Sequence, residues 1–134
     1  MKMNLDCMRD VLEYLQDMPL NACKNVNELC SELTDYEHDD VQYTCLKLYE
    51  AGMISAVTVD TDNIPLPSIE YIYDITYHGH QFWAKIKDEG RWKGIKKVLP
   101  TIRDYSIDAI NAVANGFASA AITAFFSSNQ SANG

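Results

Sequence analysis

The sequence has few basic residues, and the shortage falls on one part of the chain. Of its 134 residues, 11 are Lys or Arg and 19 are Asp or Glu, which gives a formal net charge of −8. Residues 1–60 hold twelve acidic and four basic side chains, whereas residues 61–105 hold six and seven. The last 29 residues contain one charge, Asp108. Because an acidic surface repels phosphate, the first 60 residues favour basic protein partners over nucleic acid.

The sequence also lacks the short motifs of common catalytic and metal sites. It contains no Gly-x-Ser-x-Gly, no glycine-rich phosphate loop, no His-Glu-x-x-His and no Cys-x-x-Cys. His78 and His80 lie two residues apart in a predicted helix, where alternate side chains diverge. We therefore predict that the protein is not an enzyme and binds no metal and no cofactor.

The four cysteines are predicted to be reduced thiols. Three of them, Cys7, Cys30 and Cys45, fall within predicted helices on apolar positions. No signal peptide precedes them, so the sequence indicates a cytoplasmic protein with core thiols rather than disulfides.

Apolar residues at three- and four-residue steps predict helices in the N-terminal half. The first is expected from Leu5 to Met18, with Asn4 as its N-cap and Pro19 as its stop. The second is expected to begin at a capping box, in which Asn25 caps the helix and Glu28 reaches back.

The third helix and the residues after it complete a recognisable order of elements. The helix is predicted over His38–Ala51, with Gly52 just past its end. The apolar period then changes from 3.6 to 2, which predicts strands over Ile54–Val59 and Tyr71–Ile75 and a loop over Thr61–Glu70. Three helices followed by strand, loop and strand predict an α+β, mainly helical fold of the winged helix-turn-helix type.

A C-terminal helical extension is predicted after the hairpin. Helices are expected over Thr76–Lys87, Trp92–Leu99 and Ser106–Phe126, with Pro100 ending the second of these. The polar tail after Phe126 is expected to be mobile. The predicted division is a winged-helix domain with trailing helices, a C-terminal oligomerisation helix and a flexible tail, over residues 1–99, 100–126 and 127–134.

Three segments of the sequence resemble a known family. They are Met3-Asn4-Leu5-Asp6 with Arg9-Asp10, the run Leu48-Tyr49-Glu50-Ala51-Gly52-Met53-Ile54, and Asp74-Ile75-Thr76-Tyr77-His78-Gly79-His80-Gln81-Phe82 followed by Trp92-Lys93. Together, over roughly residues 1–110, they resemble an uncharacterised phage and prophage protein family, the domain of unknown function 2513. The resemblance implies a winged-helix-like fold and a phage or prophage gene in a bacterial host. It implies no catalytic residue and no ligand.

Two charged surfaces bear on nucleic-acid binding. The third helix is expected to expose an acidic face made of Asp39, Asp40, Tyr43 and Glu50. In a winged helix this element enters the major groove, and with Lys47 as its one cation it is badly charged for that task. The basic residues gather later in the chain, around an aromatic side chain: Lys85, Arg91, Trp92, Lys93, Lys96 and Lys97. They could contact phosphate, form a solvated face, or complement the acidic half in an oligomer.

The last predicted helix has an apolar stripe that needs a cover. The stripe consists of Ile107, Ile110, Val113, Phe117, Ala121 and Phe125. The uncharged run 109–126 has the minimum length for a membrane span, but a stripe of polar residues interrupts it. We therefore predict no membrane association and an interface with a second copy.

The sequence thus predicts a phage-type interaction or regulatory module that binds a protein partner and forms a homo-oligomer in the bacterial cytoplasm. Two alternatives remain open. One is a winged-helix DNA-binding transcriptional regulator. The other is an acidic phage inhibitor that occupies a nucleic-acid-binding or defence protein of the host.

Overall fold

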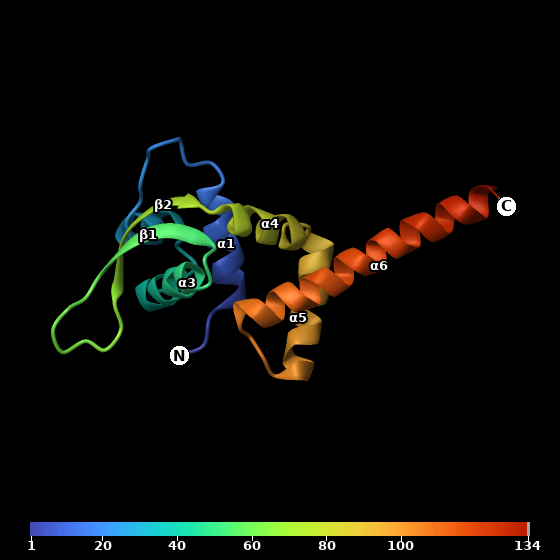
Figure 1. Cartoon of the computed structure of the whole chain (residues 1–134). Helices are drawn as coiled ribbons and strands as arrows, with labels where there is room; N and C mark the ends of the chain where they lie inside the picture. Colours follow the sequence, from blue (N-terminus) through green and yellow to red (C-terminus); the bar gives the residue numbers. More distant parts are fainter. Residues whose placement is uncertain (134) are drawn as a thin grey trace. The chain divides into compact units, whose positions relative to one another are not determined.

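The computed structural model describes residues 1–133, apart from the side chains of 121–123, 125–126 and 128–133 (Figure 1). The fold is α+β and mainly helical, as predicted. Within the described residues it contains eight elements: α1 (Leu5–Leu15), α2 (Val26–Glu32), α3 (His38–Glu50), β1 (Ile54–Val59), β2 (Ser68–Ile75), α4 (Tyr77–Ile86), α5 (Glu89–Ile102) and α6 (Ile107–Asn133). The chain divides into an N-terminal unit, Met1–Ala84, and a C-terminal unit, Lys85–Gly134.

Asparagine side chains begin the first two helices of the N-terminal unit. Asn4 Oδ1 accepts a hydrogen bond from the Cys7 N–H at 3.0 Å, and Asn25 Oδ1 accepts one from the Glu28 N–H at 2.8 Å. Both predicted N-caps are therefore confirmed. The prediction that α1 reaches Met18 is wrong, because the turn after Leu15 tightens to bonds between residues three apart. A residue that precedes proline avoids the helical conformation, so the chain leaves the helix before Pro19.

The core of the N-terminal unit lies between the three helices and one face of the hairpin. α3 packs against both α1 and α2, and it contacts both strands. Its side chains Val41 and Leu48 are fully buried. Gly52 takes φ +75° immediately after α3, which confirms its predicted place past the end of the helix.

β1 and β2 form an antiparallel pair, and β2 also pairs on its other edge. β1 has its predicted bounds, but β2 begins at Ser68 rather than Tyr71, because residues 68 and 69 pair with Val59 and Thr58. On the other edge of β2, Ile72 exchanges two backbone hydrogen bonds of 2.9 and 2.8 Å with Lys24. β2 therefore lies between β1 and the segment that precedes α2.

Thr76 joins the hairpin to α4, as predicted. Its Oγ1 accepts from the Gly79 N–H at 3.0 Å and donates to the Gly52 carbonyl at 2.5 Å. A Cβ at Gly79 would collide with the Met53 carbonyl oxygen, so the close approach of backbone to backbone requires glycine here.

The C-terminal unit consists of α5 packed against α6. Asp88, which sequence reasoning overlooked, caps α5 by accepting from the Arg91 N–H at 2.7 Å. The prediction that Pro100 ends α5 is wrong, because a proline in the last turn removes only one helical hydrogen bond and α5 continues to Ile102. α6 continues to Asn133, past its predicted end at Phe126 and through the predicted tail.

Candidate interaction surfaces

The outward face of α3 is acidic, and its one cation is engaged within the helix. Asp39 and Glu50 are exposed, while Asp40 and Tyr43 are half-buried. The Lys47 ammonium lies 2.9 Å from the Glu50 carboxylate and 5.1 Å from the centre of the Tyr43 ring. The hydrogen bond with Glu50 is the main reason that the pKa of Lys47 is raised. α3 therefore presents carboxylates to solvent together with a cation that is already neutralised.

The basic cluster of the C-terminal unit is only partly available to a ligand. Lys93 and Lys97 are exposed on successive turns of α5. The Lys85 ammonium instead donates to Asn111 Oδ1 at 3.1 Å, and Arg91 donates to the Lys85 carbonyl at 3.4 Å. The part of the predicted cluster that faces solvent is thus centred on two lysines.

Trp92 cannot serve as the aromatic contact expected from the sequence. Only 3% of its surface is exposed, and it is buried on the same side of α5 as Ile95 and Leu99. Lys96 lies with its Nζ 6.0 Å from the centre of the Trp92 ring. The three-and-four spacing of these apolar residues marks Trp92 as a core residue, and its inclusion in a ligand-contacting cluster was wrong.

The α6 stripe is covered in part within a single chain. Ile110 is fully buried and Ile107 is 7% exposed, so these two side chains need no second copy to cover them. Val113 and Phe117 are half-buried. A Cβ at Gly94 of α5 would lie 2.8 Å from Phe117 Cζ, so the ring sits directly against the glycine. The last two positions, Ala121 and Phe125, lie outside the described side chains.

The β1–β2 hairpin carries an exposed apolar surface that sequence reasoning missed. Among the described residues, eleven large apolar side chains are exposed, and six of these lie between positions 57 and 73. We call the six the hairpin surface: Val57, Val59, Ile64, Leu66, Tyr71 and Tyr73. Isolated exposed apolar residues are ordinary, whereas a group of them on one structural element is a candidate interaction surface.

Two register shifts between β1 and β2 shape this surface. They change the spacing of the buried residues in β2 from two to three, so that Ile69, Ile72 and Ile75 point inward. The residues between them are exposed in two pairs, Glu70-Tyr71 and Tyr73-Asp74. Each exposed tyrosine of β2 therefore has a carboxylate beside it. The alternation expected of a regular strand gives no sign of this arrangement.

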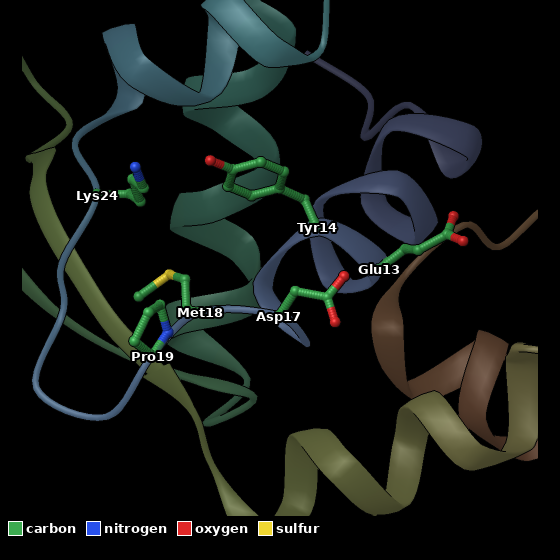
Figure 2. Close-up of a pocket in the computed structure, with 6 residues that line it drawn as sticks. All are labelled: Glu13, Tyr14, Asp17, Met18, Pro19 and Lys24. Atoms are coloured by element: carbon green, nitrogen blue, oxygen red, sulfur yellow. The ribbon is translucent and has the colours of Figure 1, made fainter.

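Two shallow depressions lie beside the hairpin in the N-terminal unit. The first has a volume of about 370 Å³ and is lined by Glu13, Tyr14, Asp17, Met18, Pro19 and Lys24 (Figure 2). The Tyr14 hydroxyl points toward Lys24, whose pKa is raised first by Tyr14 and further by Glu28. The second, of about 550 Å³, shares Met18 and Pro19 and is also lined by Tyr73. The hairpin surface therefore continues into this second depression.

The cysteines and histidines do not converge into a reactive group. All four cysteines are free thiols, and burial raises the pKa of Cys7 to about 11 and also raises the pKa values of Cys30 and Cys45. These three side chains are protonated at neutral pH, and a protonated thiol is neither a good nucleophile nor a metal ligand. In the described part of the chain, no three His, Cys, Asp or Glu side chains are grouped so that they could hold a metal ion. No helix in that part is both long and apolar enough to span a membrane.

Comparison with known families gives one match. The profile of the family described as "Hypothetical protein (DUF2513)" matches residues 2–104. The chain belongs to the DUF2513 family. No curated protein and no solved structure matches it.

The DUF2513 match covers some of these surfaces and not others. It includes the acidic face of α3, the hairpin surface and both depressions, and it extends through α5 with its exposed lysines. α6 begins at Ile107, outside the matched residues. The surfaces that the family profile spans are therefore those of the N-terminal unit and of α5.

Proposed function

We propose that this DUF2513 protein is a non-enzymatic winged-helix module that binds a protein partner through a basic surface of that partner. The observation that carries the proposal is the separation of charge. The N-terminal unit has four Lys or Arg against fifteen Asp or Glu, a balance of −11. The C-terminal unit has seven against four, a balance of +3. A surface this acidic attracts cationic proteins and speeds their association.

The winged-helix assignment is supported by topology. Three helices precede a hairpin, α3 packs on α1 and α2, and β2 is central between β1 and Lys24. A short strand between the first two helices, pairing with the second strand of the hairpin, is an arrangement expected of a winged helix. The bridge at Lys24 supplies that pairing in its shortest form.

A winged helix usually contacts DNA with its third helix and its hairpin, and in this protein the charge of both elements disfavours DNA binding. The face of α3 is acidic, and its lysine is paired with Glu50. The hairpin, residues 54–75, contains four acidic residues and no Lys, Arg or His. Phosphate contacts need several cations, so binding through these elements would bring carboxylates against the DNA backbone.

Nucleic-acid binding remains a second candidate because of α5. Lys93 and Lys97 are exposed four residues apart and so lie on one side of the helix. Two such cations support weak, sequence-independent contact with phosphate.

The first proposal has a specific form in a phage context. There the acidic protein would occupy the basic, nucleic-acid-binding surface of a host protein. Because Ile107 and Ile110 are already buried within one chain, self-association through α6 would depend on its residues beyond Ile110.

A paired binding experiment tests this proposal. The immobilised full-length protein is exposed to nuclease-treated bacterial lysate, and retained proteins are eluted with a salt gradient and identified by mass spectrometry. We expect retained proteins to be basic and to elute as salt rises, because screening weakens charge attraction. In parallel, anisotropy with a labelled 30-base-pair duplex should show no binding at physiological salt. Nanomolar binding of the duplex together with an absence of salt-sensitive basic proteins would contradict the proposal.

A further inference from the structure

We infer that the hairpin surface is the docking site for a partner segment that combines Lys or Arg with apolar side chains. This inference rests on the proposed function and names the site and the chemistry of the partner. It concerns the six exposed side chains of the hairpin and the carboxylates around them.

The apolar part of the surface is brought together by strand pairing. Val57 of β1 is the register partner of Tyr71 of β2, so their side chains lie side by side on one face of the sheet. Val59 follows two residues after Val57 and is exposed on that same face. The loop adds Ile64 and Leu66, which are 56% and 50% exposed. Tyrosine is also among the side chains most common in protein interfaces, because a large apolar ring carries a polar hydroxyl.

The charge around these side chains determines which partner fits. Asp60, Asp62, Glu70 and Asp74 are all exposed, and residues 54–75 contain no cation. Apolar side chains with a carboxylate rim match a segment with an apolar centre and basic flanks. A second copy of this chain is a poorer match, because each copy carries a net charge of −8 and an N-terminal unit of −11.

The second depression provides room beside this surface for an anchoring side chain. Its volume is about 550 Å³, and Tyr73 and Asp74 form one side of it. Leu20, on another side, is 90% exposed, which makes it the most exposed of the large apolar side chains in the described residues. A partner segment that crosses the hairpin can therefore place one side chain between Tyr73 and Leu20 and a cation near Asp74.

A random-peptide selection on the full-length protein tests both the site and the chemistry. The probe is a displayed library of random 12-residue peptides, and the affinities of selected peptides are measured by fluorescence anisotropy. We expect enrichment of peptides that contain both Lys or Arg and large apolar residues. Replacing two tyrosines of the surface, Tyr71→Ser with Tyr73→Ser, should weaken binding about tenfold or more, since buried aromatic anchors dominate interface energies.

Matched variants separate the surface from general effects on charge and fold. Tyr49→Ser with Tyr77→Ser removes two exposed tyrosines of the same unit outside the hairpin surface, and should leave affinity within about twofold. Asp60→Asn with Asp62→Asn should weaken binding several-fold. An equal change of charge elsewhere, Glu32→Gln with Asp35→Asn, should have a smaller effect.

The outcomes distinguish failure of the site from failure of the proposed function. The inference is overturned by selected peptides without basic residues, by a library that yields no binder, or by equal affinity for wild type and the Tyr71→Ser, Tyr73→Ser variant. A concentration-dependent mass in sedimentation that this variant abolishes would instead identify a second copy as the occupant. If the lysate experiment still retains salt-sensitive basic proteins, the proposed function stands and only its site is wrong.

Discussion

The two units of this protein differ in charge and in how their cores are made. The N-terminal unit carries −11 and the C-terminal unit +3, so the net charge of −8 conceals two opposite surfaces. The N-terminal core draws on three helices and the hairpin, whereas the C-terminal unit depends on the pairing of α5 with α6. Charge and packing are therefore properties of each unit, and composition averaged over the chain hides both.

The largest effect should come from truncating the N-terminal core. Leu48 is fully buried in α3, so Leu48→Ala should lower the free energy of unfolding by about 2–5 kcal/mol through lost burial and a cavity. The control, Leu20→Ala, removes a side chain that is 90% exposed. This change should alter the free energy of unfolding by less than about 0.5 kcal/mol. Urea denaturation followed by circular dichroism measures both. Equal midpoints for the two variants would mean that α3 does not organise the core.

An intermediate effect should arise where α5 meets α6. Gly94→Leu places a side chain against the Phe117 ring and should destabilise the protein by about 1–3 kcal/mol through overpacking. Combining it with Phe117→Ala relieves the clash, so the two changes should not add in a double-mutant cycle. Additive losses of stability would show that this glycine and this ring are not in contact.

Alkaline pH should weaken the N-terminal core through its thiols. The pKa of Cys7 is raised from 9.0 to about 11 in the folded chain, so the unfolded chain loses this proton at lower pH. Protonated Cys7 therefore contributes on the order of 1–2 kcal/mol to the free energy of unfolding. This contribution is complete below pH 9 and is lost as pH rises through about 11. Urea midpoints of wild type and Cys7→Ala across pH 8–11 measure it. A pH dependence of the same size in both proteins would contradict the assignment to Cys7.

The smallest effect should follow neutralisation of the exposed lysines of α5. Lys93→Gln with Lys97→Gln should leave the affinity for a selected basic peptide within about twofold, because the peptide contacts the other unit. The same variant should reduce weak binding of duplex DNA at low salt, since each lost phosphate contact lowers affinity and its salt dependence. A large loss of peptide affinity would place the partner site on α5 instead.

Local rules predicted the elements of this fold better than their extents. Asn4, Asn25 and Thr76 mark helix starts because their side chains satisfy backbone N–H groups within a few residues. The pairing of Ser68 with Val59 and the bridge between Lys24 and Ile72 depend on residues far apart in sequence, which local patterns do not encode.

The candidate site was harder to predict than the fold. Tyr71 and Tyr73 occupy alternate positions of the predicted strand, but the register shifts that expose Glu70 and Asp74 beside them arise only when β2 pairs with β1. The prediction for Trp92 had the opposite error, because it placed a buried side chain on the surface. The basic neighbours of Trp92 suggested a ligand contact, although its spacing to Ile95 and Leu99 indicated a core position. The sequence therefore predicted the charge of each surface, but it did not predict which side chains lie together on that surface.

The central claim is that the hairpin of the N-terminal unit receives a basic, partly apolar segment. Its most direct test is an NMR titration of the ¹⁵N-labelled full-length protein with the tightest-binding library peptide. The account predicts that backbone amide shifts change first and most at residues 54–75 and at residues 18–24 beside them, while α5 amides stay nearly unchanged. Changes confined to residues 89–102, or spread evenly along the chain, would contradict it.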